Sequence, residues 1–337
     1  MVFVTRQIPK AGVDLLEETV SVTVNDDDAP LGQDDLVVRA GQFDGLLTLL
    51  TDRIDRDVLA AAGPALKVIA NVAVGYDNID IPAATEAGIA VTNTPGVLTD
   101  TTADFAWTLL MGIARRVVEA DAYLRGGKYT GWGIQLMLGQ DVHHATLGIV
   151  GMGRIGQGMA QRASGFDMRV LYHDEYRLAP DRERVLNATF VDMDTLFRES
   201  DFVTLHTPLT DQTRHLVNRE RLRTMKPTAC LVNTSRGPVV NERDLAEALR
   251  EGTIAGAALD VFENEPEVNS ALLPLPNVII TPHIASASVA TRTRMATMAA
   301  ENCLCVIGGK TPPNIVNPEV LSSNRFRDRM ESWAEAS

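Results

Sequence analysis

Basic residues and cysteines are scarce in this sequence. Lys and Arg number 31 against 44 Asp and Glu, and the formal net charge is −13. Nucleic acids and anionic membranes are bound by clustered Lys and Arg, so this balance argues against both partners. Cys230, Cys303 and Cys305 form neither a CxxC pair nor an even disulfide set. We therefore expect reduced, structural thiols in a cytoplasmic protein, with no metal bound.

Long apolar runs and aromatic residues are also few. No stretch approaches about 18 apolar residues, and residues 1–10 lack a basic segment followed by an apolar core, which argues against a membrane span or a secretory signal. Aromatic residues make up 5% of the chain and hydrophobic residues 45%. That composition favours helices packed on a parallel sheet over a β-sandwich. A length of 337 residues favours two domains.

Short apolar runs alternate with helical patterns, which predicts βαβ units and parallel sheets. A break at 93–96 closes a first set of units, and a long helical pattern at 101–125 leads into a second. A further helix from about 284 to 306 could return the chain to the first domain, while 322–337 stays unassigned. The expected strands are 2–5, 20–24, 45–50 and 66–70 in the first set, and 146–150, 169–172, 201–206, 229–233, 256–260 and 277–281 in the second.

The second set begins with a glycine motif. Gly151, Gly153 and Gly156 match GxGxxG, with Arg154 and Ile155 between the last two. The motif alone is weak, but it follows a predicted strand and opens a predicted helix, whose first amides can bind a pyrophosphate. This context predicts a dinucleotide site.

The next predicted strand ends at His173-Asp174, where such folds present a carboxylate to the ribose diol. Asp174 would repel a 2′-phosphate, and Glu175 adds to the acidic bias, so we expect NAD, with NADH preferred over NADPH. Three nearby residues could soften this preference: His173, Arg177 and Arg182. The alternative interpretation of Asp174 is a solvated loop residue.

Three polar residues follow predicted strand ends in the second set. They are Arg236, Glu265 and His283, and strand ends meet at the ligand edge of a parallel sheet. Together they suit reduction of a 2-keto acid by hydride: His283 would protonate the carbonyl oxygen, Arg236 would bind that oxygen and the carboxylate, and Glu265 would favour the imidazolium. Taken singly, each is more often a loop or surface residue.

Several segments resemble the D-isomer specific 2-hydroxyacid dehydrogenase family over about residues 1–320, closest to its glyoxylate and hydroxypyruvate reductases. The segments are Val72–Asp80, Thr102-Ala103-Asp104, the glycine motif, His206-Thr207-Pro208-Leu209, Asn233–Gly237, Ala258–Phe262 and Thr281-Pro282-His283.

The resemblance implies two doubly wound α/β domains and a homodimer. A Rossmann NAD-binding domain at 100–286 would be inserted in a flavodoxin-like substrate domain at 1–99 and 287–337. Arg236 would bind substrate, Glu265 and His283 would transfer the proton, and Asp260 would hold the nicotinamide carboxamide. The cofactor would also contact Thr102, Thr207, Pro208, Thr234 and His283. Main-chain amides of Val74 and Gly75 would hold the substrate carboxylate, with Leu50 and Trp132 as pocket walls.

Alternatives remain within this resemblance. The reaction could use a larger D-2-hydroxy acid. Phosphite is a weaker alternative, because phosphite-oxidising relatives carry a Lys where this chain has Val74. A non-catalytic NAD-sensing corepressor would retain the same Arg, Glu and His, so only turnover separates a sensor from an enzyme.

Overall fold

The computed structural model describes residues 1–334, with side chains through Glu331. The chain forms two compact units: unit 1 is Met1–Leu98 together with the chain from Ala287 onward, and unit 2 is Thr99–Ser286. Within the described part of the chain, no helix is long and apolar enough to cross a membrane.

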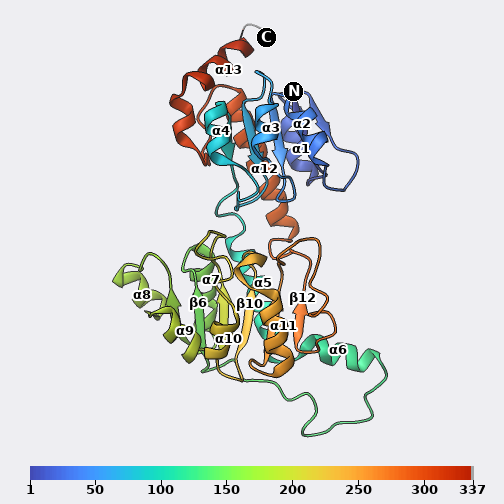
Figure 1. Cartoon of the computed structure of the whole chain (residues 1–337), viewed down its shortest axis with the longest axis vertical. Helices are drawn as coiled ribbons and strands as arrows, with labels where there is room; N and C mark the ends of the chain where they lie inside the picture. Colours follow the sequence, from blue (N-terminus) through green and yellow to red (C-terminus); the bar gives the residue numbers. More distant parts are fainter. Residues whose placement is uncertain (335–337) are drawn as a thin grey trace. The chain divides into compact units, whose positions relative to one another are not determined.

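Unit 1 is built on a five-stranded parallel sheet in the order β2-β1-β3-β4-β5, the doubly wound order of flavodoxin-like folds. Helices α1 and α12 cover one face and α2, α3 and α4 the other (Figure 1). The strands are β1 (Val2–Val4), β2 (Val22–Val24), β3 (Gly45–Thr48), β4 (Val68–Asn71) and β5 (Ala90–Thr92), and the helices α1 (Lys10–Glu17), α2 (Gln33–Ala40), α3 (Arg56–Ala60), α4 (Ile81–Ala87), α12 (Val289–Ile307) and α13 (Asn324–Ala334), with a 3-10 turn η2 (Pro318–Ser322).

Unit 2 is built on a seven-stranded parallel sheet in the order β12-β11-β10-β9-β6-β7-β8. Counted from β6, this is the Rossmann order with one added strand, and the order reverses between β6 and β9. The strands are β6 (Thr146–Val150), β7 (Arg169–His173), β8 (Ala188–Phe190), β9 (Phe202–Leu205), β10 (Cys230–Asn233), β11 (Gly256–Leu259) and β12 (Val278–Ile280).

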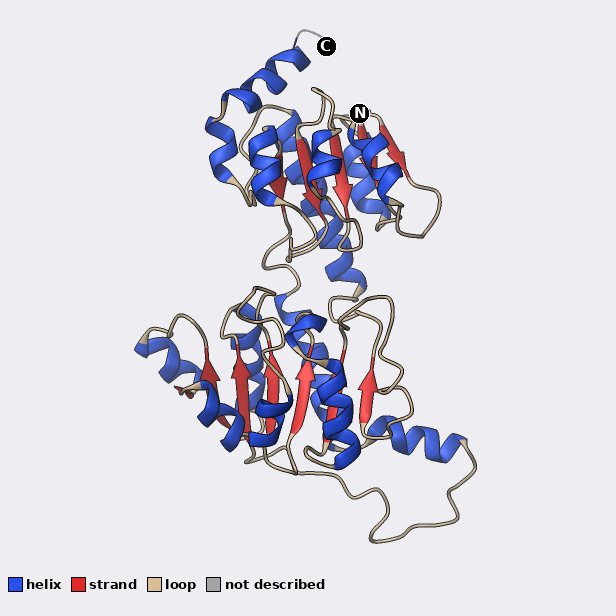
Figure 2. Ribbon diagram, in the orientation of Figure 1, coloured by secondary structure: helices blue, strands red, loops and turns tan. Residues whose placement is uncertain are grey.

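Two hydrophobic cores sandwich this sheet. Helices α5 and α7 pack on one face, and α9, α10 and α11 on the other (Figure 1). The helices of unit 2 are α5 (Thr99–Ala114), α6 (Val117–Arg125), α7 (Arg154–Ser164), α8 (Pro180–Leu186), α9 (Met193–Glu199), α10 (Arg219–Thr224) and α11 (Glu242–Glu251), with a 3-10 turn η1 (Gly237–Val239). All seven strands end at one edge of the sheet (Figure 2), where ligands of such folds bind.

The α/β fold class with two parallel sheets is confirmed, but three sequence expectations were wrong in detail. β5 was not predicted, and β8 makes the second sheet seven-stranded rather than six-stranded. β8 has three residues, of which one is buried, so it leaves no apolar run to detect. The single helix expected at 101–125 divides into α5 and α6 at Arg116, whose φ of 54° lies in the left-handed region.

Candidate active site

The glycine turn joins β6 to α7 beside the reversal of strand order. Gly151 has a φ of 90°, and a Cβ there would lie 2.6 Å from the carbonyl oxygen of His206, at the end of β9. A Cβ on Gly156 would lie 2.1 Å from the carbonyl oxygen of Gly151, so this glycine permits close packing of α7 on the turn. A Cβ on Gly153 would meet nothing within 4 Å. The turn is therefore closely packed at Gly151 and Gly156, and the space beside Gly153 is open.

The start of α7 supplies donors at this open side. Gly153 is the N-cap residue, and no side chain caps the helix. The first amides of a helix have no partner within it, so those at Arg154 and Ile155 suit an anion such as pyrophosphate. Arg154 is exposed and Ile155 half-buried. This geometry fits a dinucleotide at the predicted place.

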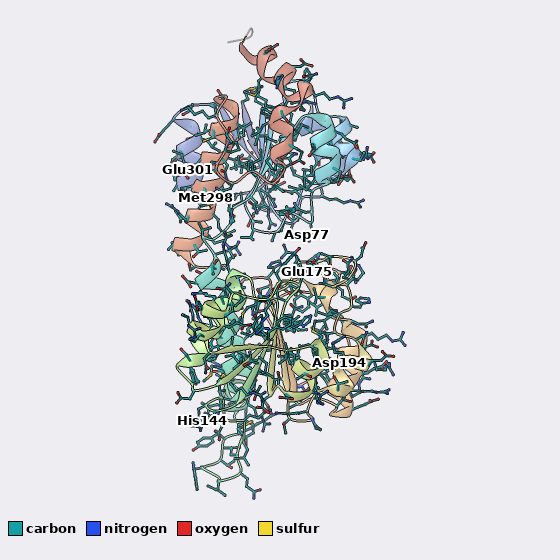
Figure 3. All side chains as sticks on the ribbon, turned by 90° about the vertical axis from the view of Figure 1, so that its left-hand side faces the viewer. Asp77, His144, Glu175, Asp194, Met298 and Glu301 are labelled. Carbon is teal, nitrogen blue, oxygen red and sulfur yellow. The ribbon has the colours of Figure 1, made fainter. Side chains whose placement is uncertain are left out.

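Asp174 lies just beyond β7 and next to the glycine turn. Its Oδ2 accepts a hydrogen bond from the backbone N–H of Met152 at 2.6 Å, and its Oδ1 accepts one from the N–H of Tyr176 at 3.0 Å. Glu175, the next residue, is exposed at the edge where the strands end, while His144, before β6, lies at the opposite end of unit 2 (Figure 3). Asp174 therefore places a carboxylate beside the turn.

His173 is engaged with β8. Its Nδ1 lies 2.9 Å from the carbonyl oxygen of Val191, and its ring stacks on Phe190 with centroids 5.6 Å apart. The ring thereby covers the end of the β7–β8 ladder.

Buried hydroxyls line the strand ends near the reversal point. Among the described residues, Thr207 Oγ1 after β9 and Thr234 Oγ1 after β10 are shielded from solvent and have no hydrogen-bond partner. Buried polar atoms are normally paired, so such groups fit the polar parts of a bound cofactor. Pro208 is exposed beside Thr207, and Thr102 is buried on α5. α5 packs on α7, where Ala103 faces Gly158.

Arg236 follows β10 in a loop that the preceding residues shape. Asn233 donates from Nδ2 to the carbonyl oxygen of Arg236 at 2.9 Å, and Arg236 Nη1 donates to the carbonyl oxygen of Ser235 at 2.8 Å. The guanidinium is half-buried, and its charge acts on Glu265. The structure thus places the Arg236 cation near the carboxylate of Glu265, which lies in the loop after β11.

Glu265 and His283 form a direct pair. Glu265 Oε2 lies 2.8 Å from His283 Nδ1, and Glu265 Oε1 accepts from the backbone N–H of Phe262 at 3.0 Å. Burial opposes ionisation of Glu265, but the hydrogen bond and charge of His283, with Arg236 adding to them, hold the pKa of Glu265 below its usual value. The side chains are 36% and 31% exposed, so Nε2 of the imidazole can meet a substrate.

Asp260 anchors the segment that carries His283. Its Oδ1 accepts from Thr281 Oγ1 at 2.6 Å and from the N–H of Ile284 at 2.9 Å, and its Oδ2 accepts from the N–H of Ala285 at 2.7 Å. Asp260 is fully buried, and burial raises its pKa. These three bonds hold His283 in its left-handed conformation, with a φ of 53°.

The predicted substrate segment of unit 1 follows β4. Asn93 Nδ2 donates to the carbonyl oxygen of Val74 at 2.8 Å, and Asn71 Nδ2 donates to that of Gly75 at 2.9 Å. Hydrogen bonds within the described chain thus occupy both carbonyls and neither amide. Leu50, half-buried, follows β3, whose carboxyl end lies at the same edge of this sheet. Both amides suit an anionic group.

Trp132 does not join this arrangement. It is 80% exposed in the long segment between α6 and β6, which runs beside the edge of unit 2 where the strands begin (Figure 2). Arg236, Glu265 and His283 lie at the other edge, where the strands end. Within one copy of unit 2, Trp132 is therefore not a wall of their site.

Residues 107–285 match the model of the D-isomer specific 2-hydroxyacid dehydrogenase family, NAD binding domain. The chain belongs to this family. It is 54% identical over 322 residues to a glyoxylate reductase of Korarchaeum cryptofilum, covering 95% of this chain and 96% of the relative.

Two solved structures extend the similarity. A crystal structure of a Thermus thermophilus protein superposes with a TM-score of 0.87 at 47% identity, covering 94% of this chain and 99% of that one. The crystal structure of an NADPH-dependent glyoxylate/hydroxypyruvate reductase of Sinorhizobium meliloti, at 32% identity, gives a TM-score of 0.80 and covers 95% and 98% of the two chains. The predictions of family, oxidoreductase class and nicotinamide cofactor are confirmed.

Sequence reasoning missed several residues of this dehydrogenase that shape the site. Glu242 binds the loop carrying Glu265, and Asn71 and Asn93 orient the Val74-Gly75 segment. Asn71 was detectable as a polar residue ending an apolar strand. Glu242 gave no such signal, because an acidic residue in the first turn of a helix is common.

Proposed function

We propose that this dehydrogenase reduces a small 2-keto acid, glyoxylate or hydroxypyruvate, to glycolate or D-glycerate with NADH. The observation that carries the proposal is the Glu265–His283 pair beside the charge of Arg236, at the sheet edge that also holds the glycine turn. The choice of substrate is supported by relatives named glyoxylate reductase that are about half identical over 95% of the chain.

The proposed chemistry uses three side chains of unit 2. A bound nicotinamide would supply the hydride that C2 of the keto acid accepts. Arg236 neutralises the substrate carboxylate and the charge that grows on the carbonyl oxygen, and a protonated His283 donates its proton to that oxygen. Glu265 stabilises the imidazolium and fixes its orientation through Nδ1. In the oxidative direction, His283 accepts the proton.

Unit 1 is the proposed substrate domain and unit 2 the NAD-binding domain. The amides of Val74 and Gly75 are the proposed donors to the substrate carboxylate, and Leu50 the proposed wall facing its C3 substituent. The Asp174 carboxylate supports a preference for NADH, because it would repel a 2′-phosphate. The Sinorhizobium meliloti relative is NADPH-dependent, so the preference has to be measured with both cofactors. We also propose a cytoplasmic location, which the three free thiols support.

A homodimer is proposed from an exposed apolar surface on unit 2. Helix α6 has no buried residue, and a cavity of about 560 Å³ lies between it, residues 138–140 and the strand starts. α6 and the following segment extend beside β12 (Figure 2). The exposed apolar residues of α6 and of the segment that follows it are Val117, Val118, Leu124, Tyr129, Trp132, Ile134, Leu136 and Leu138. Large exposed apolar surfaces often mark protein interfaces. Light scattering on the wild type and on V118E, which should dissociate, tests this proposal, and a monomeric wild type would contradict it.

The decisive experiment for function is turnover. NADH and NADPH oxidation is measured with glyoxylate, hydroxypyruvate, pyruvate and 2-ketoisocaproate, together with NAD reduction by phosphite. We expect the highest kcat/KM on glyoxylate or hydroxypyruvate, with residual activity on pyruvate, because apolar pockets discriminate by only about 1–3 kcal/mol per methylene. If the highest kcat/KM is found with 2-ketoisocaproate, the proposed substrate is wrong, whereas the family assignment still holds. No turnover on any substrate, with NADH still bound, would favour the sensor alternative.

A further inference from the structure

The loop that carries Glu265 belongs to no helix or strand. It follows β11, which ends at Leu259, and one side chain, Glu242, contacts it. Glu242 Oε1 accepts from the backbone N–H of Glu263 at 2.6 Å, and the backbone N–H of Asn269 lies close enough to stabilise the charged carboxylate. Glu265 lies between these two residues of the loop. Glu242 therefore holds the loop two residues before the proposed proton-transfer residue.

Glu242 is itself rigidly placed. It is the first residue of α11, which begins at the edge where the strands end (Figure 1), and it is 4% exposed. Its backbone N–H donates to Glu263 Oε2 at 2.9 Å, so residues 242 and 263 are joined by two reciprocal bonds. Burial, with the charges of Glu263 and Glu265 adding to it, raises the pKa of Glu242. A buried carboxylate is costly unless donors hold it, and here the donors belong to the loop.

Two further contacts lock the same loop. His215 Nε2 lies 2.5 Å from Glu263 Oε1, and the backbone N–H of His215 donates to the carbonyl oxygen of Pro238 at 2.8 Å. Gly237 lies so close to the loop that a Cβ would be 1.9 Å from the carbonyl carbon of Phe262. The loop is thus pressed against the residues that immediately follow Arg236.

We propose that Glu242 is a positioning residue for proton transfer, acting through Glu265 on His283. This role rests on the proposed function, and Glu242, which is only 4% exposed, acts through the loop that it holds. Without its carboxylate, the backbone N–H of Glu263 loses its acceptor, and the loop no longer holds Glu265 within 2.8 Å of Nδ1. Misplacement of a proton-transfer group by about 1 Å can cost as much as a hundredfold in rate.

The test is a double-mutant cycle on the full-length enzyme, with E242A, E242Q, E265Q and the double variant E242A/E265Q. We expect E242A to lower kcat for glyoxylate roughly ten- to a hundredfold, with the NADH dissociation constant changed less than about twofold. E242Q keeps one acceptor oxygen and should lose less. The double variant should be no slower than E265Q alone, because Glu242 acts through Glu265.

The control is E251Q, which removes an exposed carboxylate at the far end of α11 and should leave kcat unchanged. Additive losses in the cycle, or a kcat of E242A within about twofold of the wild type, would overturn the positioning role. If E242A does not fold, E242Q and E242Q/E265Q complete the same cycle. A wild type without turnover overturns the proposed function and this role with it, whereas an active wild type with additive variants overturns this role alone.

Discussion

The carboxylate of Asp174, at the end of β7, accepts a hydrogen bond at 2.6 Å from the backbone N–H of Met152 in the glycine turn after β6. One side chain thus holds the glycine turn in place and puts a negative charge beside it. Cofactor choice and turn geometry are therefore coupled, and a substitution at Asp174 has two separable effects.

We predict that the wild type prefers NADH over NADPH by at least about tenfold in kcat/KM, or about 1.4 kcal/mol. D174N keeps an acceptor for Met152 but removes the charge, so the preference should shrink with little loss of NADH affinity. D174A also removes the acceptor and should raise the KM for NADH further. Steady-state kinetics with both cofactors measures these effects. An unchanged preference in D174N would mean that another residue sets it.

The second prediction concerns His283. H283A should lower kcat by roughly 10² or more, because the general acid is lost, while NADH binding stays nearly intact. Fluorescence titration with NADH measures binding, and glyoxylate turnover measures kcat. H144A replaces an exposed histidine at the opposite end of unit 2 and serves as the control. A kcat of H283A within a few-fold of the wild type would assign His283 a structural role.

The sequence predicted a feature when the residues that define it lie within a short stretch of the chain. The glycines and Asp174 were predictable because a strand, a turn and a helix within a short stretch define their roles. The Glu265–His283 contact spans 18 residues, and the sequence joined the two only through their places after strand ends and through the family resemblance. β8 has too few buried residues to detect. Glu242 was missed because its partner Glu263 lies 21 residues away and its own position is an ordinary helix start.

Arg236 carries the third prediction. R236A should raise the KM for glyoxylate and also lower kcat, since a contact made in the ground state and strengthened in the transition state affects both. R236K keeps the charge but loses the planar fork of donors, so it should recover only part of the activity. Steady-state kinetics on glyoxylate checks both variants. A normal KM in R236A would remove this residue from the substrate site.

His206 makes stability depend on pH. It is partly exposed, but its Nδ1 is sealed from solvent and unpartnered within the described chain, and burial lowers its pKa to about 3. The unfolded imidazole titrates near about pH 6.5, so between these values the unfolded state binds more protons. The stability contributed by a neutral His206 is thus fully present above the unfolded pKa and is lost as the pH falls.

We therefore predict that the advantage of the wild type over H206Q, which cannot titrate, shrinks as the pH falls from about 7.5 to about 4.5. The decrease should be at most about 1.4 kcal/mol per pH unit below the unfolded pKa. Urea unfolding at several pH values measures it. A difference between the two proteins that does not change with pH would show that His206 takes up a proton in the folded state as readily as in the unfolded one.

The last prediction concerns α13, in the tail to which the sequence assigned no role. Arg329 Nε donates to the carbonyl oxygen of Ala87 at 2.9 Å, and its Nη1 donates to those of Gly63 and Leu66, the latter at 3.0 Å. Ala87 ends α4, where a positive charge is favourable, and Gly63 and Leu66 lie in the loop between α3 and β4, so one guanidinium joins a helix end to this loop. Burial lowers the pKa of Arg329, which indicates that the cation is partly desolvated.

R329A should therefore destabilise unit 1 by about 2 kcal/mol, because charge-assisted bonds are lost and partly buried carbonyls lose a donor. R327A, an exposed arginine on the same helix, is the matched control and should change stability by less than about 0.5 kcal/mol. Urea unfolding of the full chain measures both, and limited proteolysis should release the C-terminal segment faster in R329A. Since Arg329 lies outside the proposed active site, kcat on glyoxylate should stay near the wild-type value under folding conditions. Equal stability of the two variants would show that α13 is held by its apolar contacts rather than by this guanidinium.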